Sequence, residues 1–249
     1  MWRCLLAQAV TWVLIGKRSY RSRMPRCSCE PQVSYGPSDC SRPMGSQKGC
    51  HLSIVINQMS ENSIQCRFAS AVRQARQVDI LVNNAHEIPA NDWRTVTGSQ
   101  FTRHLTNASG YFLLTRLIHD RALKRRSSAS IIMLGSMYGQ VASYPEVYAG
   151  IGAATLLAYH VLKGGIIQLT RHLAVCWSRD QIRVNCLSPG PFPGPSVSRQ
   201  LKERLKKKSP ANRFGRPEEL KGAVVFLVAE ANSYVTGRNL IVDGGWSAW

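Results

Sequence analysis

The chain has 249 residues, with 32 Lys and Arg against 14 Asp and Glu, so its formal net charge is +18. A hydrophobic share of 44% over this length suits one α/β domain with a sizeable core, and it excludes wholesale disorder, a coiled coil and a collagen-like fibre. Because the basic residues are spread along the chain without interleaved aromatic residues, we expect a solvated basic surface and no specific nucleic-acid partner.

The first 50 residues differ in composition from the rest. The apolar run from Cys4 to Gly16 is shorter than the about 20 residues that cross a bilayer, so we expect no membrane anchor; an organellar presequence stays open. Residues 17–50 are rich in Ser, Pro, Arg and Cys and bury little apolar surface, which predicts loop or disorder. We therefore expect an irregular segment over residues 1–50 and one domain over residues 51–249.

From residue 51 onward, short apolar runs alternate with longer stretches of helical periodicity. This pattern is typical of a parallel sheet covered by helices. The strands are expected at Ser53–Ile56, Ile80–Val82, Ser130–Leu134, Ile182–Leu187 and Asn239–Val242. The helices are expected at Ser63–Ala75, around Leu105–Ala122, and at Leu156–Val175, Ser198–Lys207 and Arg216–Ala229.

Polar or turn-forming residues follow three of these strands. Open parallel sheets bind ligands beyond the carboxyl ends of their strands, so these positions are candidates for a site. Asn83 and Asn84 follow one strand, and Ser136 follows another. Pro189 and Gly190 form a rigid turn after a later strand, which can shape a pocket wall. Each of these motifs alone is also typical of an ordinary turn.

Tyr159 and Lys163 lie one helical turn apart on a predicted helix. Side chains at positions i and i+4 share a helix face, so the ammonium lies beside the phenol. A nearby cation favours the phenolate, which predicts a Tyr159 pKa below the usual value near 10 and useful for acid/base work. Asn107 is a poor helix former in the middle of another helix, which indicates a recruited side chain.

The order of the motifs along the chain resembles that of the short-chain dehydrogenase/reductase family, from about Ser53 to Trp249. The motifs are Asp79-Ile80-Leu81-Val82-Asn83-Asn84-Ala85, Asn107, Ser136, Tyr159-x3-Lys163, Ser188-Pro189-Gly190, Arg213-Phe214-Gly215-Arg216-Pro217-Glu218-Glu219 and Val242-Asp243-Gly244-Gly245-Trp246. The resemblance implies a Rossmann-type, doubly wound parallel sheet in three α/β/α layers, whose N-terminal βαβ portion is degraded or replaced here.

The same resemblance implies roles for individual residues. Tyr159 would be the general acid or base, Lys163 would tune it and hold the ribose of the nicotinamide, and Ser136 would bind the substrate oxygen. Asn107 would position a water in a proton relay. Residues bordering the cofactor, NAD or NADP, would be Asn57, Asn83, Asn84, Ala85, Lys163, Pro189 and Gly190. No metal site is expected, because the N-terminal cysteines lack the paired spacing of zinc knuckles.

Two departures from the family pattern lie near the expected site. The interval between Ser136 and Tyr159 is longer than is usual, so residues near 145–154 are interpreted as an inserted loop over the site or as a surface excursion. Tyr148 also follows Ser136, but it lacks a basic residue four positions later. His86 stands where the family has a glycine after the Asn-Asn-Ala run, which adds a side chain beside the expected cofactor.

A larger departure lies upstream. The family's glycine-rich turn places a helix N-terminus against the pyrophosphate, and no glycine triplet stands at the corresponding residues near 8–16. Either residues 1–50 are a foreign or frame-shifted stretch, or the protein has lost tight cofactor binding and is a catalytically silent subunit or scaffold.

The resemblance implies an oxidoreductase that interconverts an alcohol and a carbonyl on a small substrate of the sugar-acid or 3-oxoacyl type. It also implies a homotetramer or dimer formed through helices and the final segment Val242–Trp249. The apolar close Trp246-Ser247-Ala248-Trp249 is compatible with burial in a partner. The thiols of the main domain have no pairing pattern, so a cytoplasmic location is the default expectation.

Overall fold

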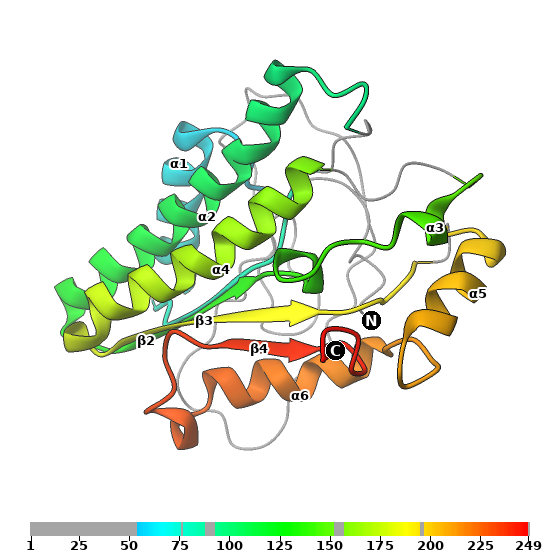
Figure 1. Ribbon diagram of the computed structural model, residues 1–249. Coiled ribbons are helices and arrows are strands. Elements are labelled where there is room, and N and C mark those ends of the chain that lie inside the picture. Colours follow the sequence, from blue (N-terminus) through cyan, green and yellow to red (C-terminus); the bar gives the residue numbers. More distant parts are fainter. Residues whose placement is uncertain (1–53, 76, 88–92, 152–156, 195–196, 249) are drawn as a thin grey trace.

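The structure is a computed structural model that describes residues 54–75, 77–87, 93–151, 157–194 and 197–248 (Figure 1). The expectations for residues 1–50, including the irregular segment, the presequence and the cysteine spacing, lie outside the described residues. None of the described helices is both long enough and apolar enough to span a bilayer.

Four parallel strands form one sheet, and they follow one another across it in chain order. They are β1 (Ile80–Asn83), β2 (Ala129–Leu134), β3 (Ile182–Pro189) and β4 (Asn239–Val242). In register, Leu81 lies opposite Ile131, and Ile131 lies opposite Val184. Because all four strands run the same way, their carboxyl ends meet at one edge of the sheet.

Helices cover both faces of this sheet, which confirms the three-layer α/β/α arrangement (Figure 1). Helices α1, α2 and α4 lie over one face, and α6 lies over the other. The α-helices are α1 (Glu61–Ala75), α2 (Gly98–Arg125), α3 (Pro145–Tyr148), α4 (Leu157–Trp177), α5 (Arg199–Lys208) and α6 (Pro217–Val228). Single turns of 3-10 helix lie at η1 (Met137–Gly139), η2 (Ser178–Asp180) and η3 (Glu230–Asn232).

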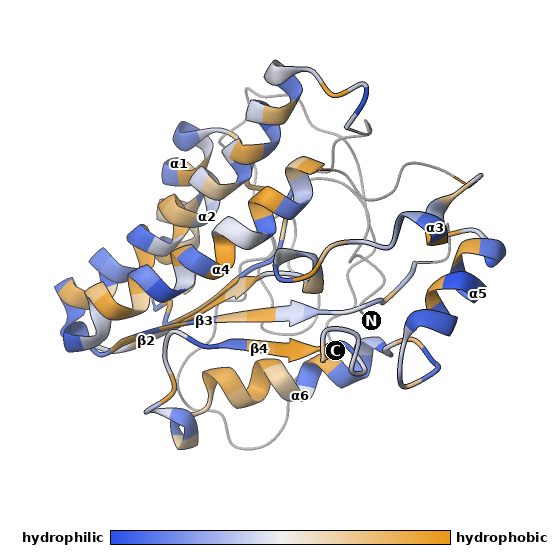
Figure 2. Ribbon diagram, in the orientation of Figure 1, coloured by the Kyte–Doolittle hydropathy of each residue, from blue (hydrophilic) through white to orange (hydrophobic). Residues whose placement is uncertain are grey.

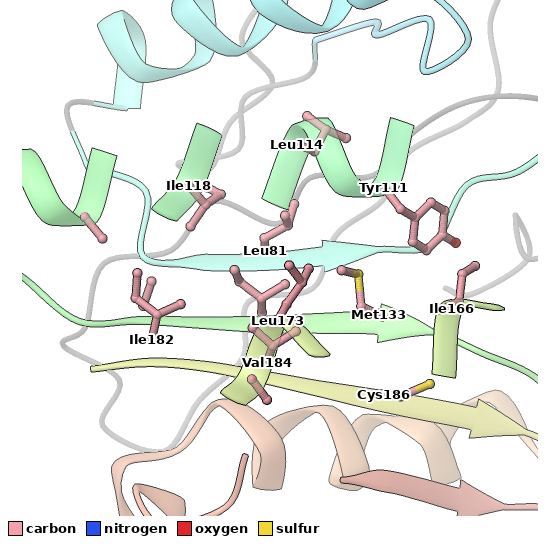
Figure 3. Packing of buried hydrophobic residues seen from close by; sticks show 14 of the residues in the cluster. Leu81, Tyr111, Leu114, Ile118, Met133, Ile166, Leu173, Ile182, Val184 and Cys186 are labelled. Carbon is pink, nitrogen blue, oxygen red and sulfur yellow. The ribbon is translucent and has the colours of Figure 1, made fainter. Parts of the chain in front are cut away.

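Alternating residues of the strands pack into two separate cores. Leu81 and Ile131 face α1, α2 and α4, where they join a cluster that includes Tyr111 and Leu114 (Figure 3). Their neighbours, among them Ile132, face α6 on the opposite side. Figure 2 shows the apolar residues of β4 and of α6 that belong to this second layer. The predicted strands have unbroken apolar runs because both sheet faces are covered.

The ends of the helices follow capping rules. Thr97 accepts a hydrogen bond from the backbone N–H of Gln100, whose side chain in turn accepts one from the backbone of Thr97 at the start of α2. Ser198 accepts a hydrogen bond from the backbone N–H of Leu201 at the start of α5. Pro217 occupies the first turn of α6, where its missing N–H costs nothing.

The strand expected at Ser53–Ile56 is wrong for its described part. Residues 54–56 have no regular secondary structure, although Ile56 is buried in the cluster below α1 and α2. A strand needs a neighbour that accepts its backbone hydrogen bonds, and β1 is the edge of the described sheet. The reversal of strand order that makes a sheet doubly wound would need strands before β1, and the described strands contain no such reversal.

Candidate active site

A cavity of about 400 Å³ lies at the carboxyl ends of β1, β2 and β3. Six of the residues expected at a site from the sequence line this cavity together: Asn84, Ser136, Tyr159, Lys163, Pro189 and Gly190. They come from three strand ends and from α4, so the parallel register and the packing of α4 on the sheet bring them together. Helices α3 and α5 add Tyr148, Leu201 and Leu205 to the wall.

Tyr159 and Ser136 lie together in the wall of the cavity. The Ser136 side chain hydrogen-bonds the Tyr159 phenol and favours the phenolate, but burial has the larger effect and raises the pKa of Tyr159 above its usual value. The lowered pKa expected from the sequence is therefore wrong for the described structure. Lys163 does not offset the burial, because its Nζ lies 5.6 Å from the centre of the Tyr159 ring and is bonded elsewhere.

Lys163 carries a fully buried ammonium group at the base of the cavity. Its side chain is 1% exposed, and its Nζ donates a hydrogen bond of 2.7 Å to the carbonyl oxygen of Leu134, the last residue of β2. Burial lowers the pKa of Lys163 to about 8. One of the three ammonium protons is used by Leu134, so the group retains donors for a ligand in the cavity.

Two histidines lie beside Tyr159. The ring centroid of His86 is 5.4 Å from that of Tyr159, and the ring of His104 is 6.4 Å from it. Burial, helped by the charge of Lys163, lowers the pKa of His86 to about 3, so its imidazole is neutral at physiological pH. The Nε2 atom of His86 is buried and has no hydrogen-bond partner among the described residues. The sequence analysis singled out His86 because it stands where the family has a glycine. It missed His104, because no motif includes that residue.

Asn107 lies behind the cavity rather than in its wall. Its Oδ1 accepts hydrogen bonds from Gln58 Nε2 at 2.6 Å and from the backbone N–H of Glu87 at 2.9 Å. Its Nδ2 donates to the carbonyl oxygen of His104 at 2.6 Å. The midhelix asparagine is thus recruited, as its sequence context indicated, to tie α2 to the segment after β1. Its partner Gln58 was missed, because nothing in the sequence links these distant positions.

The remaining cofactor candidates contact the protein itself. Asn83 points into the core, where its Nδ2 donates to the backbone oxygen of Tyr111 at 3.1 Å and to Thr115 Oγ1 at 3.0 Å. Asn57 is exposed, and its Oδ1 accepts from the backbone N–H of Met59 in the turn before α1. Ala85 is buried outside the cavity wall.

Gly190 holds the turn after β3 against the turn after β4. Its backbone N–H donates to the carbonyl oxygen of Val242 at 2.9 Å. A Cβ atom at this position would lie 2.5 Å from the Cα of Asp243, so any larger residue would push the two turns apart. This contact fixes the position of Pro189 and Gly190 at the cavity wall.

The described part of the inserted segment lies over the site. Tyr148 lines the cavity, and its hydroxyl lies 2.9 Å from the hydroxyl of Tyr138. Arg204 of α5 donates hydrogen bonds to the carbonyl oxygens of Ala149 at 2.6 Å and Val147 at 3.2 Å. These contacts support the inserted-loop interpretation for residues 145–151; residues 152–156 lie outside the described part.

The apolar close of the chain packs within its own molecule. Trp246 is 2% exposed and forms a cluster with Met137, Val147 and Leu205. Helix α5 and the inserted segment of its own chain therefore cover Trp246. Among the described residues, no group of three His, Cys, Asp or Glu side chains could hold a metal ion.

Comparisons with known proteins show what this chain is similar to. A family model described as enoyl-(acyl carrier protein) reductase matches residues 38–247. The chain is 29% identical to D-arabinitol 2-dehydrogenase (ribulose-forming) of Scheffersomyces stipitis, over 99% of this chain and 88% of that protein. It is 31% identical to galactitol 2-dehydrogenase (L-tagatose-forming) of Cereibacter sphaeroides, over 78% of this chain and 76% of that protein.

Solved structures show the same likeness. A short chain dehydrogenase from Leptospira borgpetersenii, whose crystal structure has bound NAD+, superposes with a TM-score of 0.74 at 29% sequence identity. The superposition covers 84% of this chain and 81% of that one.

Proposed function

Because this chain belongs to the short-chain dehydrogenase/reductase family, we propose that it interconverts an alcohol and a carbonyl group with NAD or NADP as the cofactor. The observation that carries the proposal is the meeting of Ser136, Tyr159 and Lys163 in one cavity wall. The relatives named above are polyol dehydrogenases, so small hydroxylated compounds are the first substrates to assay.

The described residues fit the nicotinamide end of such a cofactor. Lys163 has ammonium protons available for ribose hydroxyls, and Asn84, Pro189 and Gly190 line the same cavity. The glycine-rich turn expected at the pyrophosphate falls in residues 8–16, outside the described residues. When bound, the nicotinamide ring supplies the acceptor or donor of hydride.

The residues of the chain supply the proton chemistry. With its raised pKa, Tyr159 keeps its phenolic proton at physiological pH, so it is ready to give that proton to a carbonyl oxygen as the oxygen becomes negative. Ser136 Oγ donates a hydrogen bond to the same oxygen. The Ser136 side chain also favours the phenolate that remains. In the alcohol-to-carbonyl direction, the phenolate form of Tyr159 accepts the hydroxyl proton of the substrate. These preplaced donors stabilise charge without reorganisation.

Two measurements on the purified full chain test this proposal. NADH or NADPH fluorescence should change on binding, and Tyr159→Phe should reduce the alcohol turnover rate by about 100-fold or more while leaving that binding intact. Lys163→Ala should reduce both turnover and binding. The proposal is overturned if neither cofactor binds and Tyr159→Phe changes no turnover, which is the result that a silent subunit or scaffold would give.

A further inference from the structure

The cavity has two chemically different sides. The polar side chains lie around Tyr159, which hydrogen-bonds with Ser136. The His86 ring and the ammonium of Lys163 both lie beside the Tyr159 ring. The other side chains of the wall come largely from the turn after β3 and from α5. The apolar side includes Met137, Phe192, Val197, Leu201 and Leu205.

The apolar side is a packed wall. Met137 and Leu205 are 4% and 8% exposed and belong to the cluster around Trp246. Phe192 is held from behind, because a Cβ atom on Gly215 would lie only 2.2 Å from its ring. These side chains have little freedom to move away and admit water when a ligand enters.

Polar groups near the apolar side are engaged with one another. The hydroxyls of Tyr138 and Tyr148 are within hydrogen-bond distance of each other. Arg204 donates to backbone carbonyls of the inserted segment, and Lys208 pairs with Glu146 at 3.0 Å. Within the described part of the wall, no carboxylate lines this cavity, and the amide of Asn84 follows β1 on the polar side.

A substrate that enters must match this division. A methylene group buried against such a wall improves binding roughly fourfold. A hydroxyl buried there without a partner weakens binding by roughly tenfold. A polyol presents hydroxyls along its whole length, so it leaves several of them against apolar carbon.

We infer that the substrate is an alcohol or ketone whose oxygen lies at the reacting carbon and whose remaining body is hydrocarbon, as an alkyl chain or a carbocycle. The inference rests on the proposed function and concerns its substrate class. The reacting oxygen lies at Ser136 and Tyr159, and the hydrocarbon body lies against Leu201, Leu205 and Phe192. Tyr148, from the inserted segment, also lines this cavity. The inferred substrate class differs from the polyols after which the named relatives are called.

The experiment compares cyclohexanol and 2-hexanol with D-arabinitol on the full chain. Binding is measured by saturation-transfer NMR with and without NAD+ or NADP+, and oxidation is measured by cofactor absorbance. We expect kcat/KM for the two hydrocarbon alcohols to exceed that for D-arabinitol at least tenfold. Leu201→Gln should reduce this ratio about tenfold. Leu123→Gln is the matched control: Leu123 is 44% exposed on α2 and lies outside the cavity wall, so the ratio should not change.

The outcomes separate this inference from the function on which it rests. Faster oxidation or tighter binding of D-arabinitol overturns the substrate class and leaves the oxidoreductase function standing. If none of the three alcohols is oxidised, the proposed function fails. The NMR binding data alone then test whether the cavity prefers hydrocarbon ligands. Preferential binding of the hydrocarbon alcohols, lost in Leu201→Gln, then supports the pocket assignment, and equal binding of all three compounds overturns it.

Discussion

The two sides of the cavity are held in place by different parts of the fold. Ser136 and Lys163 are positioned by β2 and α4, since β2 lies in the middle of the sheet and the Lys163 ammonium is bonded to its last residue. Tyr148 is positioned by the inserted segment, whose described contacts to α5 include two hydrogen bonds from Arg204. The polar side of the cavity thus depends on the sheet, while Tyr148 on the apolar side depends on a loop that is tethered to α5.

The largest expected effect breaks the polar side. Ser136→Ala removes the hydroxyl that we propose as the donor to the substrate oxygen, so kcat should fall by about 100- to 1000-fold in a steady-state assay. Ser130→Ala, on the strand that precedes Ser136, is the control, because the Ser130 hydroxyl donates to the carbonyl of Leu227 on the other sheet face. A loss of similar size in both variants would contradict a direct role for Ser136.

The next effect concerns His86 and acid stability. Its folded pKa of about 3 lies below the unfolded value of 6.5, so between these values the unfolded chain binds the extra proton and stability is lost as the pH falls. At pH 5 this loss amounts to about 2 kcal/mol.

Denaturant unfolding at pH 7 and pH 5 measures this loss. The difference between the two pH values should shrink in His86→Gln, which cannot titrate. The equivalent change at exposed His172, which lies outside the cavity wall, is the control. An unchanged pH dependence in His86→Gln would show that the buried imidazole is not responsible.

A smaller effect separates the two sides most directly. Arg204→Ala releases the inserted segment from α5, so KM for a hydrocarbon alcohol should rise about tenfold, the effect of losing one or two hydrogen bonds from a charged donor. The value of kcat should change little, because Ser136, Tyr159 and Lys163 keep their places. Arg199→Ala, on an exposed part of the same helix, should change neither constant. A fall in kcat without a change in KM would mean that the segment supports the chemistry itself.

The smallest effect tests the foundation of the apolar side. Ser198→Ala removes the N-cap of α5 and should lower the free energy of unfolding by about 1 kcal/mol. Thermal unfolding measures this change. The substitution should leave kcat unaltered, because Ser198 lies outside the cavity wall. Loss of activity without loss of stability would place Ser198 in the site.

Much of the fold could be predicted from the sequence because its elements have strong periodicity. The strand at Asn239–Val242 has the predicted bounds, and the helix predicted at Ser63–Ala75 begins two residues earlier, at Glu61. The strand expected at Ser53–Ile56 was wrong because an apolar run records burial and not backbone pairing. Ile56 is buried in the core, but residues 54–56 pair with no described strand.

The sequence did not reveal that two neighbouring asparagines have different roles. Asn83 and Asn84 are adjacent, yet one side chain fixes β1 to α2 and the other lines the cavity. Their identical chemistry carries no sign of which one the strand turns inward. The pKa of Tyr159 could not be predicted for a related reason, since helical spacing placed an ammonium beside it but did not reveal the burial that outweighs this charge.

The amino-acid sequence by itself determined the alternation of strands and helices and marked the candidates for proton transfer, because periodicity and residue chemistry are local properties. The tertiary structure decided which of those side chains share a cavity, that Asn107 is engaged by Gln58, and that Trp246 is covered by its own chain. These outcomes depend on contacts between distant segments, and only the packing of the sheet and helices sets the distances and burial on which such contacts depend.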